Sequence, residues 1–186
     1  MMRKIGVDAI DYYIPTIALP IKELAEARNI EAAKLEFGLG LKFMAIPDID
    51  EDTASFAANA LLRLILNNKI DPTKIGRIYL GTESGLDAAK PTATYSIGVV
   101  EEKLKKQFGE RCFKNCDVVD LTFACIGAVD ALENCLDWVR NKEERLAIVI
   151  ASDVAKYDLN SPGEYTQGAG AVAFSIKENP SILEIK

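Results

Sequence analysis

Cys125 is the residue of this sequence best placed to act as a nucleophile. Residues 116–121 form an apolar run typical of a buried strand. The apolar residues after it recur at helical spacing: Val129, Leu132, Leu136 and Val139. Cys125 is therefore expected where a strand ends and a helix begins. Unpaired N–H groups and the dipole at a helix start stabilise a thiolate, so we expect a lowered pKa and a thiol suited to accepting an acyl group.

Two residues are candidates for catalysis, Cys125 and Glu83, and each also has a purely structural interpretation. Free cysteine is among the most buried residue types, so Cys125 could be a small core side chain. Glu83 follows the predicted strand 75–82, and open α/β sheets keep their ligands beyond the carboxyl ends of strands. It could equally be a solvated loop residue, since glutamate is mostly exposed.

Length, charge and hydropathy limit the class of protein. A chain of 186 residues with 49% hydrophobic residues can bury one core of ordinary size, so a single domain over residues 1–186 is expected. The net charge of −6 and the lack of a basic run argue against nucleic-acid or anionic-membrane partners. No signal peptide is visible and no apolar run reaches the ~20 residues of a membrane span, which favours a cytoplasmic protein.

The cysteines do not predict disulfides or a metal site. Four occur, at positions 112, 116, 125 and 135, in a regular α/β pattern without secretory features, so reduced thiols are expected. Cys112-x3-Cys116 is a poor zinc signature. The sequence contains no histidine, the commonest transition-metal ligand, and no metal is expected.

Strand and helix patterns alternate along the chain. Strands are expected at 4–14, 75–82, 111–122, 146–152, 167–174 and from 181 onward. Helices are expected at 20–28, 31–37, 52–67, 90–108 and from Cys125 to about 141. Helix 52–67 carries one apolar stripe behind an aspartate N-cap, and strand 146–152 is apolar throughout, as a central strand would be. This order predicts an α/β layered fold with a mostly parallel sheet and one antiparallel hairpin at its end.

Four stretches, in order, carry a family resemblance over essentially the whole chain. They are Gly6-Val7-Asp8-Ala9-Ile10 with Leu24-Ala25-Glu26-Ala27-Arg28, the turn Gly81-Thr82-Glu83-Ser84, the elbow Ala124-Cys125, and Ala151 to Tyr157 leading into Thr166 to Ala173. Together they resemble the N-terminal half of hydroxymethylglutaryl-CoA (HMG-CoA) synthase, in the thiolase and ketoacyl-synthase superfamily. The resemblance implies a thiolase-like half with a mostly parallel five-stranded sheet and helices on both faces.

The resemblance also implies an acyltransferase reaction. Acetyl-CoA loads its acetyl group onto Cys125, Glu83 acts as the general acid/base on the acetyl methyl, and the carbanion attacks acetoacetyl-CoA before hydrolysis. This is a step of the mevalonate pathway of isoprenoid biosynthesis. Coenzyme A thioesters are the substrates, and no cofactor is implied.

Other implied positions concern substrate binding and assembly. Glu31, Ala32, Asn160 and Thr166 match positions near the substrate. Ile126 departs from the tyrosine or small residue frequent after the cysteine, which bears on acyl preference. The superfamily implies a homodimer through edge pairing of strand 112–120.

The family also uses a histidine from a second half, which this sequence lacks. We therefore expect a fragment or split enzyme with the C-terminal half absent, unable to complete the condensation alone. Two alternatives stay open. One is a polyketide β-branching synthase acting on carrier-bound acyl groups, and the other is a non-catalytic thiolase-like assembly module.

Overall fold

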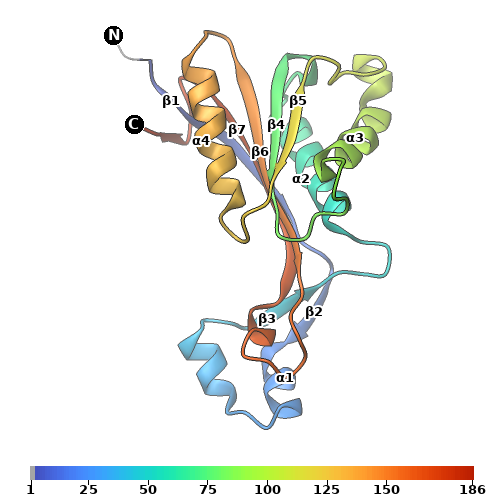
Figure 1. Cartoon of the computed structure of the whole chain (residues 1–186), viewed down its shortest axis with the longest axis vertical. Helices are drawn as coiled ribbons and strands as arrows, with labels where there is room; N and C mark the ends of the chain where they lie inside the picture. The colour runs from blue at the N-terminus through green and yellow to red at the C-terminus, as the bar shows by residue number, and fades with distance from the viewer. Residues whose placement is uncertain (1–2) are drawn as a thin grey trace.

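The computed structural model describes residues 3–186 and is built around one large sheet (Figure 1). Its strand order is β5-β4-β6-β7-β1-β8. The strands are β1 (Ile5–Tyr13), β4 (Ile75–Gly81), β5 (Asp117–Leu121), β6 (Leu146–Ala155), β7 (Gly168–Glu178) and β8 (Leu183–Glu184). The helices packed on it are α2 (Thr53–Asn67), α3 (Thr92–Phe108) and α4 (Gly127–Arg140).

The sheet is mixed rather than mostly parallel. β4 runs parallel to β5 and β6, whereas the pairs β6–β7, β7–β1 and β1–β8 are antiparallel. The α/β class is confirmed, but the prediction of a mostly parallel sheet of five strands is wrong, because residues 3–186 form six strands in this sheet. A parallel neighbour needs a crossover connection, usually helical. Only a short 3-10 turn lies between β6 and β7, so β7 must run back along β6.

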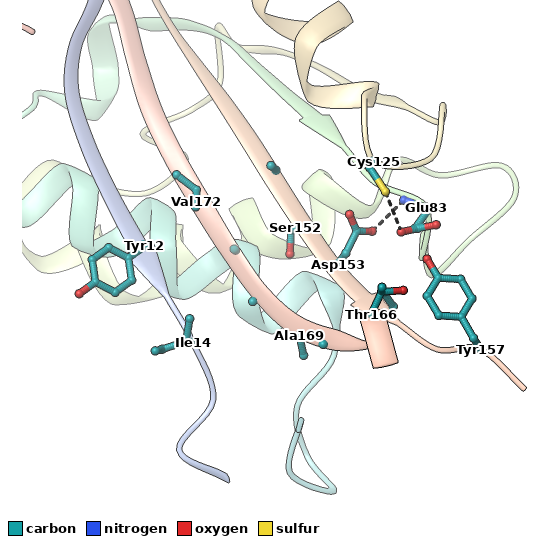
Figure 2. A pocket seen from close by; sticks show the side chains of 15 residues that line it. Tyr12, Ile14, Glu83, Cys125, Ser152, Asp153, Tyr157, Thr166, Ala169 and Val172 are labelled. Carbon is teal, nitrogen blue, oxygen red and sulfur yellow. Dashed lines mark hydrogen bonds between the residues drawn. The ribbon is translucent and has the colours of Figure 1, made fainter. Parts of the chain in front are cut away.

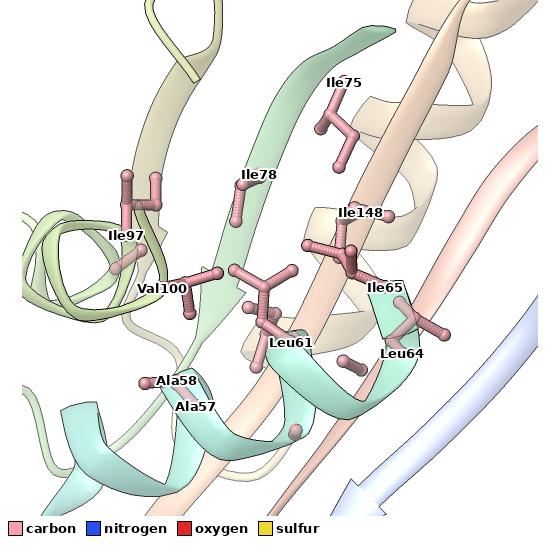
Figure 3. Close-up of a cluster of buried hydrophobic side chains, with 14 of the residues drawn as sticks. Ala57, Ala58, Leu61, Leu64, Ile65, Ile75, Ile78, Ile97, Val100 and Ile148 are labelled. Atoms are coloured by element: carbon pink, nitrogen blue, oxygen red, sulfur yellow. The ribbon is translucent and has the colours of Figure 1, made fainter. Parts of the chain in front are cut away.

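Helices cover both faces of the sheet, as predicted. α2 and α3 pack on one face and α4 on the other (Figure 1). On the α2 side, Leu61 of α2, Ile78 of β4 and Ile148 of β6 are fully buried in one apolar cluster (Figure 3). On the other side Val139 of α4 packs in a second buried cluster with Val149. The central strands are therefore covered by apolar side chains on both faces.

α2 forms where its sequence predicts it. The Asp52 carboxylate accepts from the Ser55 N–H at 2.7 Å, and the Ser55 hydroxyl accepts from the Asp52 N–H at 2.8 Å, which is a reciprocal capping box. All the predicted stripe residues are buried: Phe56, Ala57, Ala60, Leu61, Leu64 and Ile65. The cap fixes where the helix starts, and the start of α2 contacts the candidate site described below.

A small lobe, residues 17–46, extends from one end of the sheet (Figure 1). It contains the antiparallel pair β2 (Ile17–Pro20) and β3 (Phe43–Ile46) and the helix α1 (Ile21–Ala27). The sequence predicts α1, but a π-helical turn at Lys34–Gly38 replaces the helix expected at 31–37. Neither β2 nor β3 was predicted as a strand, because four residues are too few to reveal an alternating pattern.

Three strands differ from the sequence in burial or length. β5 was expected to be buried, but it lies at an edge of the sheet and is half-exposed. β6 is central, as predicted, and it continues to Ala155, three residues past the end of its apolar run. β7 likewise continues past position 174, to Glu178. The extension of β6 places Asp153 on a strand rather than in a loop.

Residues 3–186 hold neither a candidate membrane span nor a candidate metal cluster. No helix within residues 3–186 has both the length and the apolar character needed to cross a bilayer. In the same range, no three cysteine, aspartate or glutamate side chains gather where they could hold a metal ion.

Gly81 allows α4 to start directly beside the end of β4, and this predicts a contrast in stability with a glycine of α3. A Cβ at Gly81 would collide with the backbone nitrogen of Ala128, whereas a Cβ at Gly98, on the exposed side of α3, meets nothing within 4 Å. We expect Gly81→Ala to lower the free energy of unfolding by about 2 kcal/mol or more through overpacking. Gly98→Ala should raise it by up to about 1 kcal/mol through helix propensity. Urea denaturation checks both, and equal effects would contradict the close approach.

Candidate active site

Cys125 lies in the turn between β5 and α4, as the sequence predicts. Its side chain is exposed, which excludes the alternative of a buried core residue. Ala124 before it has a φ of 43°, in the left-handed region that L-residues rarely adopt. The Ile126 N–H then donates to the Phe123 carbonyl at 3.1 Å, which closes the turn. This sharp elbow presents the thiol at the carboxyl edge of the sheet.

Glu83 follows the end of β4 and reaches Cys125. The thiol of Cys125 donates to Oε1 of Glu83 over 3.6 Å (Figure 2). The two residues are 42 positions apart in the chain, and the parallel pairing of β4 with β5 brings their strand ends together. The structure therefore joins the two predicted catalytic residues into one pair.

Asp153 of β6 holds the turn that carries Glu83. Its Oδ1 accepts from the Thr82 hydroxyl at 2.8 Å, the Glu83 N–H at 2.7 Å and the Ser84 hydroxyl at 2.9 Å. The carbonyl of Ser84 also accepts from the Thr53 hydroxyl at the first position of α2, at 2.9 Å. Sequence reasoning did not single out Asp153, although it stands in one of the motifs quoted above. A carboxylate directly after a buried strand was the available signal.

The charge of Glu83 sets the protonation of Cys125. The nearby carboxylate raises the pKa of the Cys125 thiol above its ordinary value, and Asp153 contributes in the same direction. The expected lowering of this pKa is therefore wrong. α4 begins only at Gly127, and a negative charge at 3.6 Å outweighs the helix start. Cys125 is a neutral thiol at pH 7.

The other three thiols have different surroundings. Cys112 and Cys135 are buried and Cys116 is half-buried. Burial raises the pKa of Cys116 and of Cys135 to about 12. All four cysteines are free, as expected for reduced thiols, and Cys125 is the exposed member of the four.

A pocket of about 490 Å³ opens in front of Cys125 and Glu83. Its walls come from β1, β6, β7 and the loop between β6 and β7, and include Tyr12, Ile14, Tyr157, Thr166 and Val172 (Figure 2). Glycine and alanine of β7, Gly168 to Ala171, line part of it, so little side-chain volume fills the space. This volume suits a small acyl group with part of its carrier.

Tyr157 is a pocket residue that sequence reasoning missed. Its phenol oxygen points toward the Glu83 carboxylate (Figure 2). The charge of Glu83 raises the pKa of Tyr157, so the phenol is neutral at pH 7 and can donate a hydrogen bond. A tyrosine shortly after a central strand was a weak signal.

The four predicted substrate-binding residues are not gathered at one place. Thr166 lines the pocket. Asn160 is exposed in the loop between β6 and β7 outside the pocket lining, and its N–H donates to Glu164 at 2.9 Å. Glu31 and Ala32 lie in the small lobe, where Ala32 packs against the lobe core. Ile126 is exposed and does not line the pocket either, so it does not shape the acyl space formed by residues 3–186.

The fold and the site together present an exposed thiol on a strand–turn–helix elbow, paired with a carboxylate at the edge of a layered sheet. A family model described as "Hydroxymethylglutaryl-coenzyme A synthase N terminal" matches residues 1–181. The chain belongs to the HMG-CoA synthase family.

Individual relatives agree with this assignment. The HMG-CoA synthase of Haloferax volcanii is 35% identical over 99% of this chain, and that of Enterococcus faecalis is 36% identical over 98%. A solved structure, "MvaS in complex with 3-hydroxy-3-methylglutaryl coenzyme A", is 36% identical with a TM-score of 0.90 over the whole chain, which is 43% of its own length. The chain spans 41% and 44% of the two curated relatives.

The Glu83–Cys125 contact makes a prediction about thiol reactivity. Glu83→Gln removes the negative charge that opposes the thiolate, so the pKa of Cys125 should fall and its alkylation by iodoacetamide at pH 7.5 should accelerate roughly two- to tenfold, since one pKa unit is a factor of ten in thiolate. Peptide mapping over a pH series measures the rate at each thiol.

The matched control for this prediction is Asp137→Asn, which removes an exposed carboxylate of α4 that pairs with Arg140. It should leave the Cys125 profile unchanged. Equal profiles for the parent chain and Glu83→Gln would contradict the pairing.

Proposed function

We propose that this chain is the N-terminal catalytic half of an HMG-CoA synthase, condensing acetyl-CoA with acetoacetyl-CoA through an acetyl-cysteine intermediate at Cys125. The observation that carries the proposal is the 3.6 Å contact between the Cys125 thiol and the Glu83 carboxylate beside an open pocket. This contact joins a nucleophile to a base in the geometry that covalent catalysis requires.

The acetyl-transfer step follows from the protonation of the pair. Because the pKa of Cys125 is raised, its thiol proton must leave as the sulfur attacks, and Glu83 is in hydrogen-bond contact to take it. The new bond joins Sγ to the acetyl carbon, and the bond from that carbon to the CoA sulfur breaks. The proton passes from Glu83 to the departing CoA sulfur, which restores the carboxylate.

The condensation step uses the same carboxylate. Glu83 removes a proton from the acetyl methyl, and the resulting carbanion attacks the ketone carbon of acetoacetyl-CoA. A carbon–carbon bond forms, the C=O π bond opens to an alkoxide, and the alkoxide takes the proton from Glu83, which restores the carboxylate. Water then cleaves the thioester to Cys125 and frees the thiol. We assign contact with the acyl group to Tyr157 and Thr166, which both line the pocket. We assign Glu31, Ala32 and Asn160 to binding the rest of the CoA substrates.

Several finer features belong to the same proposal. We assign the chain to the mevalonate pathway in the cytoplasm, with no cofactor beyond the CoA thioesters. We also propose a homodimer formed through residues 112–120. The position of β5 at the sheet edge supports this, as does the exposure of Val119. The chain alone should not complete the condensation, because the resemblance implies a histidine that this sequence lacks.

The carrier-protein alternative has weaker support. The structure "Crystal Structure of the Curacin Biosynthetic Pathway HMG Synthase in Complex with Acetyl Donor-ACP" is 26% identical, with a TM-score of 0.83 over 99% of this chain and 43% of its own. The HMG-CoA synthases above are 35–36% identical. A non-catalytic module has no need of the paired thiol and carboxylate.

Acetylation tests the proposal directly. After incubation with acetyl-CoA, intact mass and peptide mapping should find one acetyl group, confined to Cys125 and absent from Cys125→Ser. Acetylation by an acetyl-carrier protein but not by acetyl-CoA would favour the polyketide alternative. A folded chain that iodoacetamide alkylates at Cys125 but that neither donor acetylates would contradict an acyl-transferring half site.

A further inference from the structure

The segment 156–167, here called the β6–β7 loop, forms part of the candidate pocket wall and has one apolar anchor in the small lobe, Tyr165, which packs against the lobe core. Tyr157 and Thr166 line the pocket, and Asn160 lies between them in the sequence. Leu159 is 76% exposed, so it does not hold the loop against the body. Beside the packing of Tyr165, polar contacts hold the loop.

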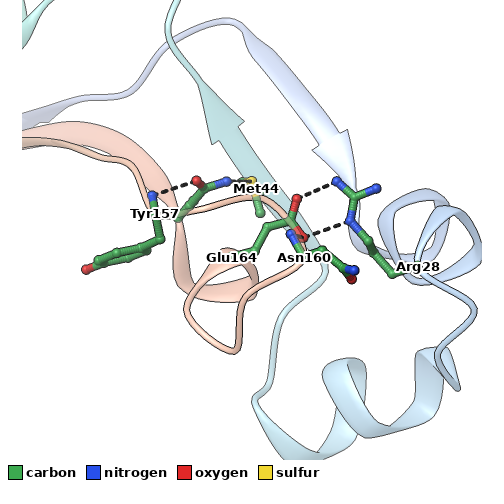
Figure 4. Close-up of polar contacts among 6 residues, drawn as sticks. Arg28, Met44, Tyr157, Asn160 and Glu164 are labelled. Carbon is green, nitrogen blue, oxygen red and sulfur yellow. Dashed lines mark hydrogen bonds and ion pairs between the residues drawn. The ribbon is translucent and has the colours of Figure 1, made fainter.

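One contact joins the loop to the small lobe. Arg28, directly after α1, donates from Nε to Oε2 of Glu164 at 2.8 Å and from Nη2 to Oε1 at 2.6 Å (Figure 4). The Glu164 side chain is only 2% exposed. Its Oε2 also accepts from the Asn160 N–H at 2.9 Å, so the same carboxylate binds the lobe and folds the loop on itself.

A second contact closes the base of the loop. Gln167 Oε1 accepts from the Tyr157 N–H at 2.8 Å, and its Nε2 lies 3.9 Å from the sulfur of Met44 in β3 (Figure 4). The lobe thus reaches the loop by two routes, through Glu164 to the backbone of Asn160 and through Gln167 to the backbone of Tyr157. Tyr157 in turn points toward Glu83.

The Arg28–Glu164 pair has the properties of a geometric constraint. A carboxylate taken out of water is costly unless it is fully bonded, and such pairs are weak evidence for stability by themselves. Arginine offers a planar fork that fixes orientation, which lysine does not. The paired guanidinium holds the pKa of Glu164 below its ordinary value, so the pair stays ionised at neutral pH.

We propose that Arg28 is a positioning residue: through Glu164 it holds the β6–β7 loop so that Tyr157 lies against Glu83 and Thr166 closes the Cys125 pocket. The proposal rests on the proposed function for its catalytic meaning. The loop position can be tested without acyl transfer, because Tyr157 beside Glu83 affects the pKa of the Cys125 thiol.

The first test measures the pH profile of Cys125 alkylation by iodoacetamide. A neutral phenol beside Glu83 offsets part of the carboxylate charge, so Tyr157→Phe should raise the apparent pKa of Cys125 further. Arg28→Ala should also raise the apparent pKa of Cys125. The double variant Arg28→Ala/Tyr157→Phe should raise this pKa no further than Arg28→Ala alone. Arg28→Lys should fall between Arg28→Ala and the parent. Trypsin cleavage after Lys156 should accelerate several-fold in Arg28→Ala.

The second test measures acetylation of Cys125 over a range of acetyl-CoA concentrations. Arg28→Ala should reduce the maximal rate about tenfold, with little further loss on adding Tyr157→Phe. The control Arg140→Ala breaks an exposed arginine–aspartate pair on α4 and should match the parent. Urea denaturation shows whether Arg28→Ala folds. If it does not, Glu164→Gln replaces it, because this variant weakens the same pair and keeps the shape of the side chain, and the same effects are expected.

The outcomes separate the two proposals. Two results would overturn the positioning role of Arg28. One is an alkylation profile of Arg28→Ala equal to that of the parent, and the other is a double variant in which the pKa changes of Arg28→Ala and Tyr157→Phe add in full. A parent chain that is alkylated but never acetylated would overturn the proposed function, while the alkylation profiles still decide the role of Arg28.

Discussion

The candidate site depends on the carboxylate of Asp153. Its Oδ1 accepts three hydrogen bonds, all from the turn that carries Glu83. Asp153 can do so because β4 and β6 are parallel neighbours with Gly81 opposite Ala151, which places Asp153 just beyond the end of β4. With the Glu83 backbone held there, its side chain reaches Cys125 on the elbow after β5.

The apolar core and the site are connected through the start of α2. The same Thr53 that donates to the Ser84 carbonyl accepts from the Ser152 hydroxyl through its own carbonyl, at 2.7 Å. α2 is fixed in turn by its capping box and by its buried stripe against the sheet. Packing of α2 therefore determines the position of the Glu83 turn, because a shift of the helix would break these bonds.

Much of this arrangement could be predicted from local patterns. Helix 52–67 followed from its cap and apolar spacing, and the position of Glu83 just past a strand end followed from the strand pattern. Its joint role with Cys125 was implied only by the family resemblance. The short strands of the small lobe could not be predicted, because four residues hold too little periodicity. The mixed sheet was missed because strand direction depends on connections, which hydropathy does not report.

Two errors at the site have a common physical cause. The role of Asp153 rests on partners about 70 positions away, and its place after a buried strand does not identify them. The protonation of Cys125 was judged from the helix start alone, whereas the deciding charge is that of Glu83. The local structure alone predicts a lowered pKa for Cys125, and the charge of a residue distant in the sequence raises it instead.

In the proposed reaction, Cys125 and Glu83 act on the same acyl group. The direct measurement is to incubate the chain with acetyl-CoA in D2O, back-exchange the amides in H2O, and weigh the acetylated Cys125 peptide. We expect deuterium in the acetyl methyl of the parent chain and none in Glu83→Gln acetylated to the same extent. An acetyl group on Cys125 that stays free of deuterium in the parent, or gains as much in Glu83→Gln, would contradict it.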